Sequence, residues 1–190
     1  MRKLVVTSSI IVAVSATQIA YAKTGDINFT GSLTAVTCSI TGGNGGATGN
    51  NINVKMGTVS IRDLGDGTSG NFGAETGINL DIDCTGATGL TAAVMSFAPR
   101  SGSGVVSSDT RLLQLATGAG TATGVGIAII DGANNIIDLG NAATIKTPLT
   151  AGTDDAATAK FKMRAAYIKT ATTPTAGTAN ATMPFTIAYE

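Results

Sequence analysis

The sequence predicts an all-β domain of the sandwich type, and two observations lead to this prediction. Apolar and polar residues alternate in several short stretches, which is the period of a strand with one buried face. Glycine-rich breaks separate these stretches, at residues 42–49, 65–77, 118–124 and 171–177. Several short strands punctuated in this way are typical of a β-sandwich.

The alternation places the expected strands in order along the chain. Their apolar positions are Ile52, Val54 and Met56; Ile78, Leu80, Ile82 and Cys84; Val125, Ile127 and Ile129; and Phe161, Met163, Ala165 and Tyr167. Each stretch is expected to form a half-buried strand, with the intervening residues in solvent. The apolar parity changes from Met56 to Val59 and Ile61, which predicts a bulge near Gly57.

The first 22 residues have the three parts of a secretory signal peptide. Arg2 and Lys3 give a positive start, residues 4–16 are largely apolar, and Ala20 to Ala22 form an A-x-A cleavage site. The apolar run is too short and too polar to span a bilayer. We expect cleavage after Ala22, with cleavage after Ala16 as the alternative, and therefore an exported protein.

The charge balance argues against a nucleic-acid partner. The chain has 12 basic and 12 acidic residues, and removal of Arg2 and Lys3 would leave 10 basic residues and a net charge of −2. No basic cluster contradicts this balance. Charged residues make up only 13% of the chain, which suits a protein that packs against copies of itself.

Cys38 and Cys84 are the two cysteines of the chain, and in an exported protein they predict one disulfide. A bridge across a loop of this size stabilises a fold by about 4 kcal/mol in the chain-entropy model. A metal site is the poorer alternative, because the chain has no histidine and two thiolates do not complete a zinc shell. We expect no metal and no cofactor.

The two ends of the mature chain carry further patterns. Apolar residues occupy every second position from Met183 to Tyr189, so the last expected strand runs to the end of the sequence, and its outer edge needs a cover. Near the other end, the apolar residues of the stretch 25–33 are odd-numbered, whereas Val36, Cys38 and Ile40 are even-numbered. A bulge explains this change of parity, and so does a division in which the two sets serve different cores.

These ends resemble the subunits of bacterial chaperone–usher pili, the type 1 fimbrial protein family. The family pattern has a glycine about fourteen residues from the end, alternating apolar positions and a penultimate aromatic residue. Gly177 and Tyr189 match its two ends. The stretch 25–33, followed by Cys38, resembles the donor strand that one pilin inserts into its neighbour. The resemblance covers the whole mature chain.

The resemblance implies an immunoglobulin-like β-sandwich that lacks its final strand and is completed by a donor strand. It divides the chain into a signal peptide (1–22), a donor-strand extension (23–35) and a pilin domain (36–190). It also implies two sets of site residues: Gly25, Ile27, Phe29, Gly31 and Leu33 as the donor strand, and Gly177, Met183, Phe185, Ile187 and Tyr189 as the acceptor groove and chaperone-binding edge.

The implied function is that of a structural pilus subunit which polymerises by donor-strand exchange into a surface fimbrium used in adhesion. The implied partners are other pilin subunits, a periplasmic chaperone, an outer-membrane usher and, as a further candidate, a host receptor. The chain would pass through the periplasm to the cell surface. Two alternatives are a minor or tip-associated adhesin and a free secreted immunoglobulin-like binding module.

Enzymatic activity is not expected. Without histidine the chain lacks the commonest general base and any Ser-His triad. Asp81 and Asp83 share one strand face, but simple alternation accounts for them as solvated side chains. We therefore assign no catalytic residues.

Overall fold

The computed structural model of the chain describes residues 37–42, 44, 46–48, 51–86, 89–151 and 157–190. Contacts divide the chain into a unit of residues 1–34 and a unit of residues 35–190, and all described residues belong to the second unit. The predicted signal peptide and the predicted donor strand lie outside the described residues. Among the described residues, no helix is long and apolar enough to cross a membrane.

Strands and three single-turn 3₁₀ helices make up the regular structure of the described residues. In chain order they are β1 (Thr37–Gly42), β2 (Ala47–Thr48), β3 (Asn51–Ile52), η1 (Ile61–Asp63), β4 (Glu75–Thr85), β5 (Ala92–Phe97), η2 (Pro99–Ser101), β6 (Val105–Val106), β7 (Asp109–Gln114), β8 (Val125–Ile130), η3 (Leu139–Asn141), β9 (Thr144–Pro148), β10 (Thr150–Ala151), β11 (Ala157–Lys169) and β12 (Phe185–Tyr189). The prediction of an all-β fold is confirmed.

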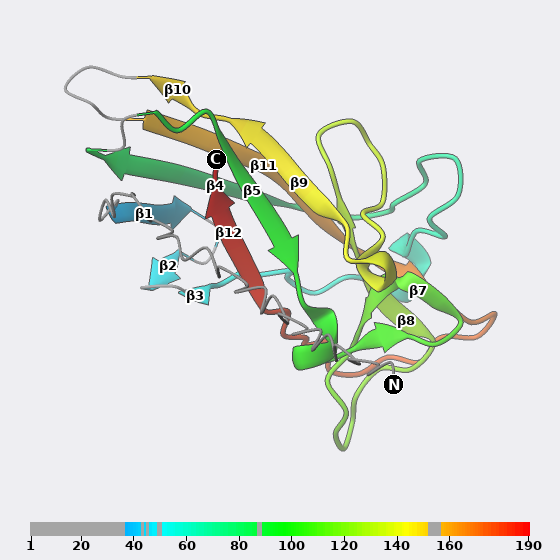
Figure 1. Cartoon of the computed structure of the whole chain (residues 1–190). Helices are drawn as coiled ribbons and strands as arrows, with labels where there is room; N and C mark the ends of the chain where they lie inside the picture. The colour runs from blue at the N-terminus through cyan, green and yellow to red at the C-terminus, as the bar shows by residue number, and fades with distance from the viewer. Residues whose placement is uncertain (1–36, 43, 45, 49–50, 87–88, 152–156) are drawn as a thin grey trace, which may run out of the picture. The chain divides into compact units, whose positions relative to one another are not determined.

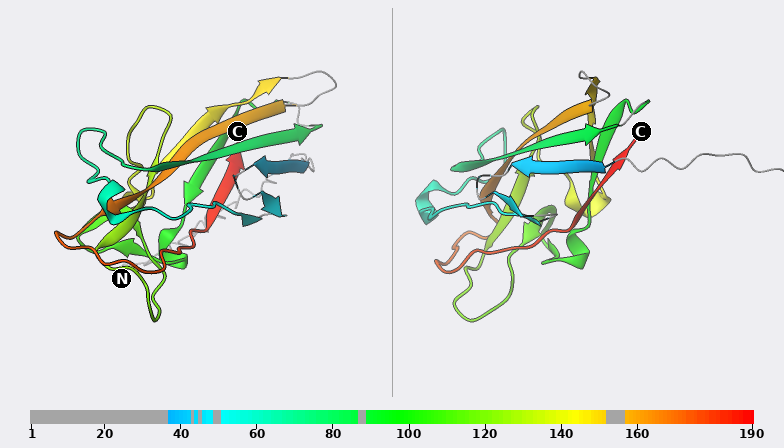
Figure 2. Two further views of the ribbon diagram at one scale, coloured as in Figure 1. Left: turned by 180° about the vertical axis from the view of Figure 1, so that it is seen from behind. Right: turned by 90° about the vertical axis from the view of Figure 1, so that its left-hand side faces the viewer.

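The strands form a large and a small antiparallel sheet (Figure 1). The large sheet has the order β1-β4-β11-β8-β7-β6, with β10 also paired to β11. The small sheet has the order β12-β5-β9, so β12 is one of its edges, and β2 and β3 form a separate two-stranded pair. The further views of Figure 2 show β12 beside β5 and β4 beside β11.

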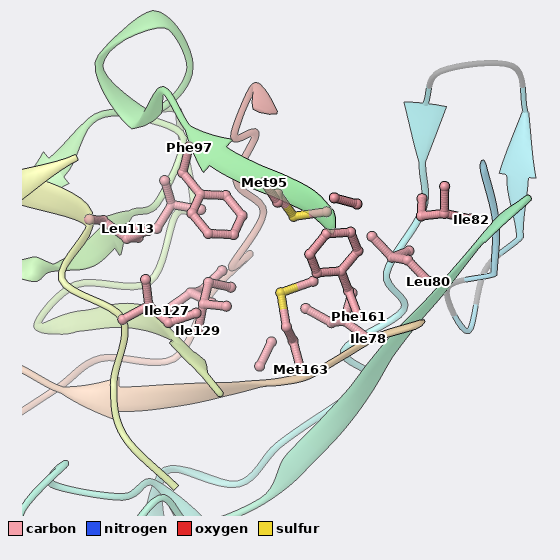
Figure 3. Close-up of a cluster of buried hydrophobic side chains, with 14 of the residues drawn as sticks. Ile78, Leu80, Ile82, Met95, Phe97, Leu113, Ile127, Ile129, Phe161 and Met163 are labelled. Atoms are coloured by element: carbon pink, nitrogen blue, oxygen red, sulfur yellow. The ribbon is translucent and has the colours of Figure 1, made fainter. Parts of the chain in front are cut away.

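The main hydrophobic core lies between these two sheets. Phe161 of β11, Leu80 of β4 and Met95 of β5 are almost completely buried in it. Figure 3 shows Met95 of β5 pointing toward Phe161 of β11, and Phe97 of β5 beside Leu113 of β7. The alternation predicted for β4 is confirmed, because Ile78, Leu80, Ile82 and Cys84 are buried while Asn79 and Asp83 are exposed.

A second hydrophobic cluster covers the outer face of part of the large sheet. Its buried members are Phe72, Leu112, Ala128, Ile130, Ala166 and Ile168. Two loops provide the cover: Gly65 forms a parallel bridge with Ile168, and Ile136 forms a bridge with Ile130. Both faces of β8 and of the end of β11 are therefore buried. The expectation that these two strands expose one face along their whole length is wrong.

The segment around Gly57 also differs from the expectation. Met56 and Val59 both pack against the main core, so the change of parity is real. However, Gly57 lies outside the strands and has a φ of 72°, so a left-handed glycine makes the change rather than a bulge in a ladder. Ile61, expected on the apolar face, is 42% exposed, because η1 interrupts the strand period there.

The predicted disulfide between Cys38 and Cys84 is present. The two residues lie directly opposite each other in the β1–β4 ladder. β1 is an edge strand, so this bridge ties the edge of the large sheet to its interior. Cys38 and Ile40 pack against the main core, as their even parity predicts.

The second cluster predicts a large loss of stability for one substitution and almost none for another on the same face of β11. Ala166 is 0% exposed, so Ala166→Lys should lower the free energy of unfolding by at least about 3 kcal/mol by burying an unpaired charge. Lys162 is exposed, and Lys162→Ala should change it by less than about 0.5 kcal/mol. Urea denaturation of both variants measures the difference, and equal effects would contradict a covered outer face.

Candidate functional site

A groove of about 1000 Å³ opens into the main core between residues 51–57 and residues 179–185. Its floor consists of core side chains from both sheets. They are Ile78 and Leu80 of β4, Met95 and Phe97 of β5, Leu113 of β7, Ile127 and Ile129 of β8, and Met163, Ala165 and Tyr167 of β11. The floor is thus almost entirely apolar.

The first wall of the groove is the C-terminal segment that ends in β12. The side chains of Met183, Phe185, Ile187 and Tyr189 are half-buried and pack against the main core, whereas Thr186 and Ala188 are exposed. The predicted alternation of this segment is confirmed. Residues 179–185 line the groove, and β12 continues the wall along the edge of the small sheet.

Among the described residues, the backbone groups of this first wall form hydrogen bonds on one side of the segment. The N–H of Ala98 donates to Pro184 O, that of Ser103 to Thr182 O, and that of Ala116 to Asn180 O. The even-numbered residues therefore bond toward β5 and the neighbouring loops. Because alternate residues of an extended chain direct their backbone groups to opposite edges, the odd-numbered residues direct theirs toward the groove. Pro184, which has no N–H, is an even position and leaves this free edge intact.

The second wall consists of residues 51–57, which the sequence did not identify as part of a site. Ile52, Val54 and Met56 are half-buried against the main core, while Asn53 and Lys55 are exposed. The N–H of Asn53 donates to Gly46 O at 3.1 Å, and the Asn44 side chain bonds both backbone groups of Lys55. Here the odd-numbered residues bond away from the groove, so the even-numbered residues direct their backbone groups toward it.

Tyr167 joins the floor to the first wall. Its hydroxyl donates a hydrogen bond of 2.8 Å to Ala179 O, at one end of the groove lining. Burial raises the pKa of this hydroxyl above its usual value, and burial likewise raises the pKa of Tyr189. The hydrogen bond fixes the beginning of the first wall on the floor.

The structure distributes the predicted acceptor residues over three environments. Met183 and Phe185 line the groove, whereas Ile187 and Tyr189, further along β12, pack on the core beyond the lining. Gly177 lies outside the groove, against another stretch of backbone: a Cβ atom there would be 2.4 Å from Gly120 O. Close packing of two backbones explains why a glycine opens this segment. The five predicted donor-strand residues lie outside the described residues.

The parity of Ile52, Val54 and Met56 was visible in the sequence, but nothing in the sequence indicated that these residues face the C-terminal segment.

The chemistry of the groove is limited, since Lys55 and Tyr167 are the ionisable residues of its lining. Among the described residues, no group of three acidic, cysteine or histidine side chains could hold a metal ion. With apolar floor and two backbone edges, the groove suits an extended peptide strand.

One protein-family model and several solved structures match this chain. The sequence profile described as fimbrial protein matches residues 27–190. No curated protein matches the chain. The similar solved structures include two pilus proteins and a tip adhesin. The CupB6 tip adhesin of Pseudomonas aeruginosa has 24% identity and a TM-score of 0.49, over 72% of this chain and 36% of that one. This chain therefore spans about a third of the length of that adhesin.

Two further similar structures are matched over nearly their whole length. An antigen and type I fimbria protein of Burkholderia pseudomallei has 24% identity and a TM-score of 0.48, over 82% of this chain and 99% of that one. The P pilus rod subunit PapA has 17% identity and a TM-score of 0.44, over 88% of this chain and 100% of that one.

Tyr167→Phe should lower the free energy of unfolding by about 1 kcal/mol, because Ala179 O loses its hydrogen bond. The folded-state pKa of Tyr167 lies above its unfolded value, so the tyrosine stabilises the fold fully below pH ~10 and loses this contribution as the pH rises through the folded-state pKa. The stability difference from the unsubstituted protein should therefore be constant from about pH 7 to 9 and shrink above about pH 10.

Tyr189→Phe is the matched control, because its hydroxyl makes no hydrogen bond to a described residue. Near neutral pH, Tyr189→Phe should lower the free energy of unfolding by less than Tyr167→Phe does. Equal costs in urea denaturation at pH 7 would contradict the role of the Tyr167 hydrogen bond.

Proposed function

Because the chain belongs to the fimbrial protein family, we propose that its groove binds the N-terminal strand of a neighbouring subunit and that subunits polymerise by donor-strand exchange. The chain is a pilus subunit of the cell-surface fimbrium, and its partners include other pilin subunits. The proposal concerns how those subunits are joined. A strand added to a sheet edge gains affinity from backbone hydrogen bonds and specificity from alternate side chains in pockets.

The observation that supports the proposal most directly is the pair of backbone edges above an apolar floor. The first wall directs the backbone groups of Ala181, Met183 and Phe185 toward the groove, and the second wall directs those of Val54 and Met56 toward it. An inserted strand would bond to these edges and cover the floor at the same time. An isolated small molecule or a helix would leave the edges without partners.

The lengths of the three segments are compatible. Residues 51–57 and residues 179–185 each provide seven residues, which span about 23 Å when extended. The predicted donor strand, residues 25–33, numbers nine, and its apolar members Ile27, Phe29 and Leu33, which share one parity, span seven of these. Those three side chains would contribute about 5–9 kcal/mol if fully buried on the floor.

The groove also needs a cover before a neighbouring subunit is bound. Before exchange the groove would expose apolar side chains and free edges, a combination that favours aggregation. We propose that a periplasmic chaperone covers it first and that an outer-membrane usher receives the subunit, so that the chain reaches the cell surface through the periplasm. The role is structural rather than enzymatic, in keeping with the family and with a groove whose ionisable residues are Lys55 and Tyr167.

Phe29→Asp should block the donor role of a subunit. It replaces an apolar side chain by a charge without a partner on the groove floor, and the loss of the Phe burial alone, about 2 kcal/mol or more, would weaken insertion at least thirtyfold. The measurement is the yield of polymer from purified subunits, read from ladders in gels run without boiling.

Asn28→Asp is the matched control, since it adds the same charge one residue away on the opposite face of the donor strand. It should leave the polymer yield within about twofold of the unsubstituted chain. Equal inhibition by both substitutions would contradict the proposed register. Normal ladders from a chain that lacks residues 23–31 would contradict donor-strand exchange itself.

A further inference from the structure

The second wall of the groove has little support from the sheets. β3 pairs with β2, but residues 53–59 belong to no strand. The described backbone contacts of the wall beyond β3 are the bond from Asn53 N–H to Gly46 O and the two bonds between Lys55 and the side chain of Asn44. The position of the wall therefore depends on few groups.

Asn44 occupies a definite place in the register of this hairpin. The pairs Ala47–Ile52 and Thr48–Asn51 define an antiparallel register. Continued by one step, the same register places Gly46 opposite Asn53, and continued by three steps it places Asn44 opposite Lys55. The bond from Asn53 N–H to Gly46 O fits this continuation. Asn44 is the next position at which a backbone pair would exchange two hydrogen bonds.

At that position the side chain of Asn44 replaces the backbone. Lys55 N–H donates to Asn44 Oδ1 at 2.6 Å, and Asn44 Nδ2 donates to Lys55 O at 2.8 Å. A carboxamide carries the same donor and acceptor as a peptide group, so it completes the ladder step. Both backbone groups of Lys55 are thereby held on the side of the wall that faces away from the groove.

The orientation of Lys55 determines the orientation of its neighbours. With Lys55 bonded outward, Val54 and Met56 keep their side chains on the core and their backbone groups toward the groove. A shift of the wall by one residue would turn the side chains of Val54 and Met56 off the core and their backbone groups away from the groove. The bonds of Asn44 oppose that rotation in the middle of the groove lining.

We infer that Asn44 is a positioning residue for strand insertion, which sets the backbone register that residues 51–57 present to the incoming donor strand. The inference rests on the proposed function, because it assigns a role in binding the donor. Asn44 itself does not line the groove. It acts through Lys55, and its loss should affect donor binding more than the stability of the two sheets.

The test uses the full chain and a fluorescent peptide of residues 23–35. Asn44→Ala should make the peptide dissociate about tenfold faster, because two hydrogen bonds that hold the wall are lost. Asn44→Asp has the same size, keeps the acceptor for Lys55 N–H and loses the donor to Lys55 O, so it should also accelerate dissociation. Hydrogen exchange should show that the peptide protects the amides of Val54 and Met56 in the unsubstituted chain and less so in both variants.

Asn79→Ala is the matched control, because it removes the same side chain at a position away from the groove. Asn79 is exposed on β4, does not line the groove, and its side chain makes no hydrogen bond to a described residue. It should leave the dissociation rate within about twofold of the unsubstituted chain. Equal dissociation rates and equal protection in Asn44→Ala, Asn44→Asp and the unsubstituted chain would overturn the role of Asn44 while leaving the proposed function intact. No binding of the peptide by the unsubstituted chain would overturn both.

Discussion

The main core of this protein is open along one side, and this opening accounts for the arrangement of the segments beside it. Side chains of β4, β5, β8 and β11 form an apolar floor that water would otherwise contact. The two segments beside this floor direct backbone N–H and C=O groups across it. Because apolar area and unpaired backbone groups both cost free energy when left uncovered, an extended peptide is the occupant that removes both costs.

Much of the fold could be predicted from local period. The alternation in β4 gives its buried and exposed faces, and the parity of Cys38 and Ile40 places β1 on the core. The errors lie where distant segments cover a strand. Ala128 and Ala166 were expected in solvent, but the loops that carry Phe72 and Ile136 bury them. Alanine is too weakly hydrophobic to indicate that a strand face is buried. The local sequence also does not indicate which loop folds onto which face.

The site was predicted for one wall and missed for the other. Met183 and Phe185 were identified from the alternation of the last strand and its resemblance to a known ending. Val54 and Met56 have the same kind of alternation, but the sequence does not record which segment they face across the core. Gly177 was recognised as part of a pattern, and its physical reason, the approach to Gly120 O, depends on a contact between segments far apart in the chain.

The disulfide gives the chain a covalent ring between Cys38 and Cys84, which are separated by 46 positions, and the second wall of the groove lies inside that ring. A mechanical load applied to the chain before Cys38 would pass through sulfur directly into β4. While the disulfide is intact, the load cannot extend the residues between the two cysteines, which would add about 160 Å of extended backbone. In a fibre that carries tension from one subunit to the next, residues 39–83, which include most of β1 and the second wall, would therefore lie outside the path of the load.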